Sequence, residues 1–440
     1  MRSLGNANAM RNLVEHIRRG GFVRDTAILT AGTAIAQAII IIATPVLSRL
    51  YTPAEYGMLA LFVAILSISS TLITLRYEVV ILLPKCEAEA KALVMLVLGL
   101  AIAVGSLIAL LACMLSDRIR AWGGLHDVHS WLTIAVFMSI GTAGIATCTN
   151  WFNRRREYTS IATTRIMQSL IFVIIGTVLG LISVTEGLLY SQAISVSLTL
   201  IITSSIAYKS LKPHSRLEPR LLVNVARDYQ RAPIFLLPTA LLDVVSMQLP
   251  VLLITVWFSS DSAGQYSMAW RLLALPGSLV GAAIGQVFFQ RLSNTWPDAM
   301  ASKALLLKTW KMLALFGIVP AIVIMFLGKS LLVWILGTVW HEAGIIAAIL
   351  APMVFMSLIH SPTSTAFIVL GMEKLMLYFG VAVLIYRPLC FFVGKYYESL
   401  YVGLCLFVTI EICQMLIFQY LTINNINTRL IPNAQNVVKV

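Results

Sequence analysis

Six charged residues lie inside long apolar stretches of the sequence. Insertion scales put a charge at the centre of a membrane helix at about 3 kcal/mol, so six facing lipid would cost on the order of 18 kcal/mol. Arginine binds anions such as phosphate through paired hydrogen bonds, and a membrane carboxylate exchanges a proton or holds a cation. We therefore expect most of the six to face water, a ligand or one another. They are Arg76, Glu78, Asp243, Arg271, Arg387 and Glu411.

Helical geometry gives a separate expectation for the first two. In a continuous helix that ends near Pro84, Arg76 lies about 12 Å from the inner end, at about 1.5 Å per residue. It either snorkels, forms a structural ion pair or binds a ligand. Glu78 is two positions on, so it cannot share a helix face with Arg76. We expect Glu78 to reach the inner interface.

The other four charges lie at different depths. Arg271 is about two turns inside an outer helix end, where lining a cavity is favoured. Arg387 lies close enough to an outer end to snorkel. Asp243 and Glu411 are nearer mid-span and have short side chains, so we expect interior positions and an ion-coupling role, with Glu78 as a third candidate.

Prolines and glycines accompany these charges. Proline removes a backbone donor and kinks a helix, which membrane proteins tolerate where a cavity or a neighbour satisfies the freed carbonyl. We predict hinges at Pro45, Pro250 and Pro276. A stripe of glycines spaced by four lets another helix approach and slide, with static packing as the plain alternative. The stripe consists of Gly277, Gly281 and Gly285.

The elements that must position these residues are membrane helices. Of 440 residues, 59% are hydrophobic and 12% charged, and the mean hydropathy is +0.88. A soluble domain has about 25% charged residues, and a membrane helix needs roughly 20 apolar ones. We predict an all-α, polytopic membrane protein with about twelve spans. They are 26–48, 57–82, 89–115, 131–152, 160–182, 186–208, 232–257, 264–290, 304–327, 343–370, 375–393 and 399–421.

The positive residues that give the net charge of +13 are unevenly distributed along the chain, in a pattern that indicates the membrane topology. Lys and Arg concentrate in the termini and in alternate loops, which places both termini in the cytoplasm. The basic balance therefore indicates attraction to anionic membrane lipids rather than nucleic-acid binding.

Two stretches indicate an internal repeat. They are "RLYTPAEYGMLALF" and "FSSDSAGQYSMAWRLL", which align when Tyr56 is matched with Tyr266. Two parallel six-helix halves explain this spacing. We predict a cytoplasmic amphipathic segment over 1–25 (its helix at 9–20), six-helix bundles over 26–208 and 232–421, a cytoplasmic linker over 209–231 and a cytoplasmic tail over 422–440.

The sequence contains none of the enzyme motifs that we looked for. The sequence lacks GxxxxGK[ST], HExxH and GxSxG, and the longest internal connection, Lys209 to Arg231, leaves no room for a catalytic domain. The six cysteines show no CxxC, and the histidines do not cluster, so we expect no catalytic residues, metal site or cofactor. Transport is the default interpretation.

Four stretches together resemble one family. "LSRLYTPAEYG", "LRYEVVILLP", "NWFNRRREYTSIATTRIMQS" and "AGQYSMAWRLLALPGSLVGAAIGQVFFQRLS" look like the polysaccharide biosynthesis proteins of the oligosaccharide flippase family. These are the Wzx-type O-antigen and exopolysaccharide flippases of the multidrug/oligosaccharidyl-lipid/polysaccharide superfamily. The match runs from about residue 24 to 420.

The resemblance implies a fold and an activity. The fold is two six-helix bundles around a central cavity. The activity is alternating-access transport of undecaprenyl-diphosphate-linked oligosaccharide repeat units across the bacterial inner membrane, for O-antigen, capsule or exopolysaccharide synthesis. Its partners are the lipid-linked oligosaccharide, membrane lipids, and the polymerase and chain-length proteins of the pathway. Arg76, Arg271 and Arg387 are then the expected substrate-binding residues.

Two alternatives stay open. A multidrug or cation antiporter of the same superfamily would use membrane acids such as Asp243 and Glu411 for coupling. A polysaccharide polymerase would need a large outer loop with basic catalytic residues, whereas the predicted outer loops are short.

Overall fold

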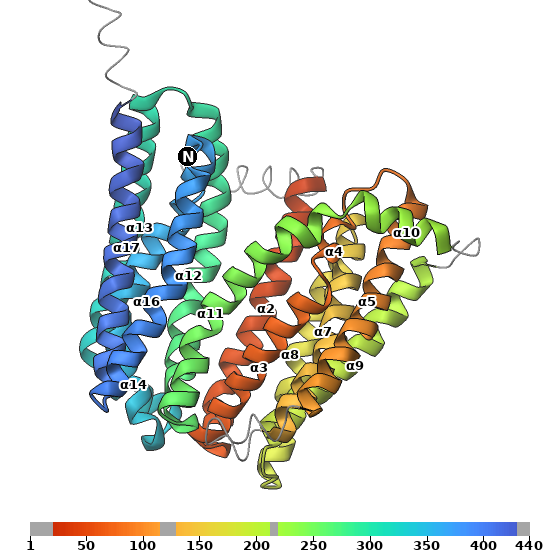
Figure 1. Cartoon of the computed structure of the whole chain (residues 1–440). Helices are drawn as coiled ribbons and strands as arrows, with labels where there is room; N and C mark the ends of the chain where they lie inside the picture. The colour runs from red at the N-terminus through yellow and green to blue at the C-terminus, as the bar shows by residue number, and fades with distance from the viewer. Residues whose placement is uncertain (1–20, 115–128, 212–218, 429–440) are drawn as a thin grey trace, which may run out of the picture. The chain divides into compact units, whose positions relative to one another are not determined.

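The computed structural model describes residues 21–114, 129–211 and 219–428, and within these ranges the chain is helical and contains no β-strand (Figure 1). Eleven of its helices are long and apolar enough to cross a membrane, by length and composition. Helix α12 (Ser260–Thr295), which contains the predicted span 264–290, is not among the eleven, and several of its side chains lie outside the described ones. The predicted all-α, polytopic class is confirmed.

The chain divides into two compact units. The first takes its described residues from Met1–Leu47 and Ile65–Leu241, and the second from Ser48–Ala64 and Leu242–Val440. The first unit contains most of α2 (Gly21–Leu50), the later part of α3 (Pro53–Ile73), α4 (Tyr77–Val80), α5 (Glu87–Met114), α7 (His129–Arg154), α8 (Tyr158–Leu181), α9 (Gly187–Leu211), α10 (Pro219–Asp228) and the π-helix η1 (Ala232–Leu236). The second contains most of α11 (Leu237–Trp257), α12, α13 (Ala299–Leu336), the 3₁₀ turn η2 (Thr338–Trp340), α14 (His341–Thr363), α15 (Ala366–Leu370), α16 (Glu373–Tyr396) and α17 (Leu400–Thr428).

The first unit has its main core where α4, α5, α7 and α10 meet. Leu93, Trp151 and Phe152 are fully buried there. The amphipathic helix α10 adds Leu221, Leu222 and the buried Val225 to the same cluster. The predicted linker 209–231 therefore contains a helix that packs against α5, rather than a plain connection.

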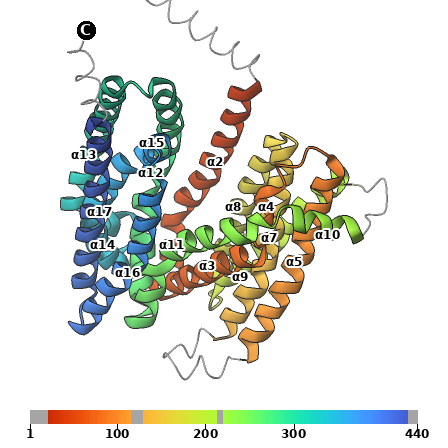
Figure 2. The same ribbon diagram turned by 45° about the horizontal axis from the view of Figure 1, so that its top comes forward.

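The second unit is centred on α14, which packs against α12, α13 and α17 (Figure 2). The end of α2 and the start of α3 join this unit through buried contacts. The Trp340 indole nitrogen donates a hydrogen bond to the Ser48 carbonyl oxygen (2.9 Å), and its ring meets the Tyr56 ring edge-on with the centroids 5.2 Å apart. These contacts explain why Ser48–Ala64 groups with the second unit, although the sequence prediction placed it in the first bundle.

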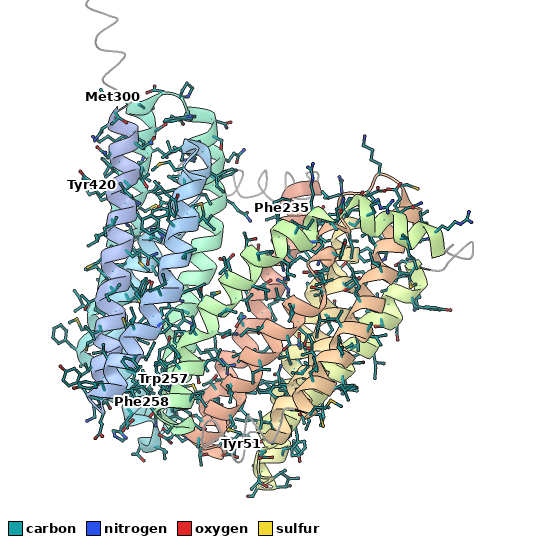
Figure 3. The ribbon with its side chains drawn as sticks, in the orientation of Figure 1. Tyr51, Phe235, Trp257, Phe258, Met300 and Tyr420 are labelled. Carbon is teal, nitrogen blue, oxygen red and sulfur yellow. The ribbon has the colours of Figure 1, made fainter. Side chains whose placement is uncertain are left out.

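Apolar side chains cover much of the outer surface, as a membrane protein requires. Phe235, Met300 and Tyr420 are exposed and point away from their helices (Figure 3). Exposed aromatic residues also gather where helices end. Trp334 lies at the end of α13 and Tyr396 at the end of α16, which is typical of side chains at a membrane–water interface.

Two predicted spans are interrupted. The predicted helix over 57–82 ends at Ile73 and resumes as α4, and the predicted helix over 343–370 is divided into α14 and α15. At the C-terminal end α17 continues to Thr428, past the predicted boundary at 421. The predicted helix at 9–20 and the rest of the tail, 429–440, lie outside the described residues.

Candidate functional site: arginine-lined cavities and a broken helix

The break between α3 and α4 sets the position of Arg76. Leu75 and Arg76 take the left-handed conformation, with φ of 49° and 61°. This conformation costs a non-glycine residue about 1–2 kcal/mol, so tertiary contacts must hold it. Tyr77 supplies one such contact, because its hydroxyl donates to the Ala226 carbonyl oxygen of α10 at 2.9 Å. Val80 supplies another, since it is buried in the core of the first unit. The prediction of a continuous helix through Arg76 was wrong for this reason.

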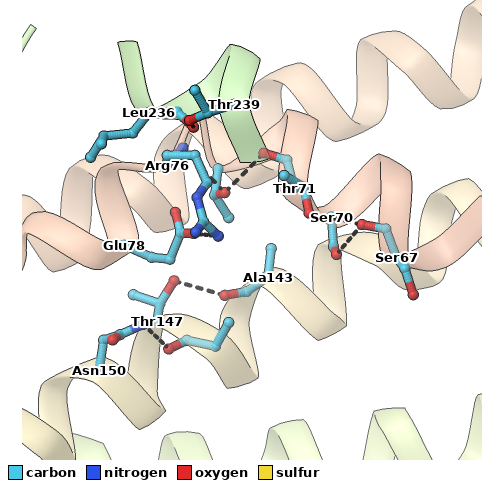
Figure 4. Close-up of polar contacts among 12 residues, drawn as sticks. Ser67, Ser70, Thr71, Arg76, Glu78, Ala143, Thr147, Asn150, Leu236 and Thr239 are labelled. Carbon is cyan, nitrogen blue, oxygen red and sulfur yellow. Dashed lines mark hydrogen bonds and ion pairs between the residues drawn. The ribbon is translucent and has the colours of Figure 1, made fainter. Parts of the chain in front are cut away.

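The break also brings Arg76 and Glu78 together. Arg76 Nη1 lies 3.1 Å from Glu78 Oε1, and the two side chains are 33% and 6% exposed. Side chains two positions apart in a helix point in different directions. The left-handed turn at Arg76 ends the helix, so the two side chains can meet (Figure 4). Glu78 is thus a buried partner of Arg76 and does not reach the surface, contrary to the sequence expectation.

Polar side chains of α3 and α7 surround this pair (Figure 4). Thr147 and Asn150 of α7 donate to carbonyl oxygens one turn back, at 2.7 and 3.0 Å, and Ser70 of α3 donates to the Ser67 carbonyl oxygen at 3.1 Å. These groups are satisfied within their own helices. Within this cluster, the solvent-exposed part of the Arg76 side chain is therefore the group that can bind an anion.

Arg387 forms the second ion pair, inside the second unit. Its Nε and Nη2 lie 2.7 and 2.6 Å from Oε1 of Glu411, and its Nη1 donates to the carbonyl oxygen of Ser246. The guanidinium also lies 5.6 Å from the centre of the Phe407 ring. With the side chains 16% and 8% exposed, this contact ties α16 to α17 and α11. The expectation that Arg387 snorkels to an outer interface was wrong, because a buried carboxylate holds it inside.

A cavity of about 350 Å³ adjoins this ion pair. Half of its lining residues are aromatic or contain sulfur, and a few polar groups lie among the others. Its lining is Met247, Gln248, Pro250, Val251, Tyr266, Trp270, Met353, Ser357, Arg387, Phe407, Glu411 and Met415.

Arg271 lines a neighbouring cavity of about 180 Å³ in the same unit. The remaining wall comes from α3, α11 and α12 and is formed by Tyr56, Leu59, Ala60, Val63, Gln248, Val251, Ser267, Met268 and Trp270. In the described part of the chain no carboxylate forms a salt bridge with Arg271. The half-buried Arg271 thus lies at a cavity and has no counter-ion among the described residues.

Asp243, the last of the six charged residues, and the three predicted hinge prolines lie at separate positions in the fold. Asp243 is exposed on α11, so it does not occupy the expected interior position. Pro45 lies within α2, two residues before the boundary between the units at Leu47. Pro250 is buried in α11 and lines the larger cavity. Pro276 lies within α12, and its side chain is outside the described ones.

The glycine stripe is not where helices approach most closely. A methyl group on Gly281 or Gly285 would lie 3.8 or 3.5 Å from the nearest atom of Pro362, which is ordinary contact, and one on Gly277 would meet nothing within 4 Å. The close crossing is elsewhere. A methyl on Gly57 would lie 1.8 Å from the Ser260 carbonyl oxygen, and one on Gly264 would lie 1.7 Å from that of Pro53.

Sequence reasoning missed the residues shared by the two cavities. Gln248 and Trp270 line both of them. One signal was present: Gln248 is an uncharged polar residue in the middle of an apolar span, and Trp270 directly precedes Arg271. Among the residues that the structure describes, no group of three metal-binding side chains comes together.

These features define a class: a polytopic α-helical membrane protein with arginine-lined cavities. Similar solved structures include a lipid II flippase and a multidrug-resistance transporter. The inward-closed lipid II flippase MurJ aligns with a TM-score of 0.71 and 12% identity over 93% of this chain and 92% of that one. An inward-facing multidrug-resistance MATE transporter of the MOP superfamily aligns with a TM-score of 0.64 and 13% identity, over 91% and 95% of the two chains.

A further similar structure is a MOP-superfamily transporter from Pyrococcus furiosus, with a TM-score of 0.57 and 11% identity, over 92% and 96%. At these identities the likeness shows the fold. No curated protein sequence matches the chain. The family model described as polysaccharide biosynthesis protein matches residues 46–345, more than half of the sequence, and the chain belongs to this family. The resemblance drawn from the sequence motifs is thereby confirmed.

Proposed function

We propose that the protein is a flippase that moves undecaprenyl-diphosphate-linked oligosaccharide repeat units across the bacterial inner membrane, with both termini in the cytoplasm. Family membership and the transporter fold support a lipid-linked saccharide as the cargo. The glycan and the diphosphate cannot cross about 30 Å of hydrocarbon unaided, whereas the polyprenyl tail can stay in lipid.

The observation that carries the proposal is Arg271. It lines a cavity, and no carboxylate in the described part of the chain forms a salt bridge with it, so its guanidinium is available for two parallel hydrogen bonds to phosphate oxygens. Arg387 is neutralised by Glu411, which makes it the weaker candidate for a diphosphate ligand.

Arg76 is the proposed ligand in the other unit. We assign the diphosphate to Arg76 when the transporter faces inward and to Arg271 when it faces outward. Bending near Pro45, Pro250 and Pro276 is the proposed motion. Glu78 already occupies one face of the Arg76 guanidinium, so a phosphate would bind through the exposed part.

The antiporter alternative depends on free membrane acids. Glu411 and Glu78 are both engaged by arginines, which leaves the exposed Asp243 as the candidate for coupling to protons or sodium. The flippase is favoured because both of these buried acids already have an arginine partner.

Complementation of a deletion strain tests the assignment. We expect Arg271→Ala and Arg76→Ala each to abolish surface polysaccharide while membrane protein levels stay normal. Arg291→Ala is the matched control, since Arg291 is exposed on the same helix as Arg271 and lines neither cavity. Full complementation by both the Arg76 and the Arg271 variants, or resistance to cationic drugs that depends on Asp243, would overturn the proposal.

A further inference from the structure

We infer that the larger cavity of the second unit binds the first sugar of the lipid-linked substrate and selects an uncharged one. The inference rests on the proposed function, which assigns the diphosphate to Arg271. It adds a sugar-binding site formed by Gln248, Tyr266, Trp270, Ser357, Phe407 and Glu411.

The two cavities adjoin each other, as do the diphosphate and the first sugar in the substrate. The cavities of about 180 and 350 Å³ share three wall residues, Gln248, Val251 and Trp270, so they adjoin each other. In a glycosyl diphosphate the first sugar is bonded directly to the phosphate. A diphosphate on Arg271 therefore places that sugar next to the shared wall, where the larger cavity begins.

The wall chemistry fits a sugar ring. Tyr266, Trp270 and Phe407 contribute aromatic groups to the wall, and the C–H groups of a pyranose can pack against such groups. Gln248 can donate and accept hydrogen bonds, and Ser357 can do both through its hydroxyl, as sugar hydroxyls require. A mostly apolar wall with a few convergent polar groups is the usual composition of a small-molecule site.

The ion pair sets the charge preference. Three nitrogen atoms of Arg387 are already engaged, two by Glu411 and one by the Ser246 carbonyl. The pair leaves the cavity without net charge. A sugar carboxylate would have to compete with Glu411 for Arg387 and would leave one buried carboxylate unpaired, so an acidic first sugar is disfavoured.

The test uses the full-length protein in lipid nanodiscs and three probes: farnesyl diphosphate, its N-acetylglucosamine conjugate and its glucuronic acid conjugate. We expect the neutral conjugate to bind about tenfold more tightly than farnesyl diphosphate, as one or two added hydrogen bonds provide. The glucuronic acid conjugate should show no such gain.

Two serine variants of α14 localise the effect. Ser357→Leu removes a hydroxyl and fills the larger cavity, so it should cancel the gain from the sugar and leave farnesyl diphosphate binding intact. Ser361→Leu is the matched control one turn further on, because Ser361 is exposed and lines neither cavity. Retained diphosphate binding shows that a variant is folded.

The outcomes separate the inference from the proposed function. If the wild type binds farnesyl diphosphate through Arg271 but the sugar adds nothing, or if Ser357→Leu keeps the gain, the sugar site is wrong and the flippase proposal stands. If the wild type binds none of the three probes and instead binds an aromatic cation that depends on Glu411, both are wrong.

Discussion

The Arg387 guanidinium reaches acceptors on two helices, the Glu411 carboxylate of α17 and the Ser246 carbonyl of α11. Removing two charges from solvent costs several kcal/mol per ion, and the geometry of the pair offsets that cost only while both partners are present. The contact therefore acts chiefly to orient three helices around the larger cavity. Removing one partner is therefore expected to lower the stability more than replacing both partners with apolar residues.

We predict that Glu411→Ala lowers the stability of the second unit by about 3–5 kcal/mol, since it leaves the Arg387 charge buried and unpaired. The combined variant Arg387→Met with Glu411→Leu should recover most of that loss. The apparent melting temperature of detergent-solubilised protein measures both. A combined variant that melts below Glu411→Ala would contradict this account.

The charged residues inside the spans could be predicted from the sequence, but their ion-pair partners could not. The six membrane charges were identifiable from hydropathy alone, and four of them proved to be two pairs. The partners were not predictable. Arg387 and Glu411 are distant in sequence, and the pairing of Arg76 with Glu78 depends on a left-handed turn at Leu75, a residue type that gives no signal for that conformation.

Among the described glycines, those with the closest contact to another helix lie near the N-terminal ends of α3 and α12. Gly57 of α3 packs against the Ser260 carbonyl, and Gly264 of α12 packs against the Pro53 carbonyl. The contact is reciprocal. Gly57 directly follows Tyr56, and Gly264 lies two residues before Tyr266, the two tyrosines that align the predicted repeat. Helix packing through small residues is the usual device within membranes.

We predict that Gly57→Ala and Gly264→Ala each destabilise the protein by more than about 3 kcal/mol, because backbone on the neighbouring helix would have to move, a larger change than the 1–3 kcal/mol of ordinary overpacking. Gly281→Ala is the control, with its nearest contact at 3.8 Å. Membrane levels and thermal stability provide the readout. Wild-type stability for both variants would show that the crossing is looser than described.

Helix positions followed from apolar length, but breaks within helices did not. The division of the tenth predicted span into α14 and α15 occurs near Pro362, a visible signal. The break after Ile73 has neither glycine nor proline, and it is held by burial of Tyr77 and Val80 in the core of the first unit. Such a break depends on tertiary contacts, which local sequence does not encode.

On the scale of the whole molecule, the chain passes between the two units three times: after Leu47, after Ala64 and after Leu241. Apolar patterning was enough to predict a polytopic protein, and the internal repeat inferred from the offset of the two tyrosine motifs stays a prediction. The grouping of Ser48–Ala64 with the second unit required the Trp340 contacts with Ser48 and Tyr56, which join residues almost 300 positions apart. Family membership links this architecture to polysaccharide biosynthesis.

The central claim is that this protein carries a lipid-linked saccharide from the inner to the outer leaflet. The most direct test deletes the gene and measures undecaprenyl-linked repeat units on each leaflet, with surface polysaccharide as the second readout. We predict that repeat units accumulate on the inner leaflet, that polymer is lost, and that the wild-type gene restores both. Normal polymer, or repeat units accumulating on the outer leaflet, would contradict the claim and place the protein outside the translocation step.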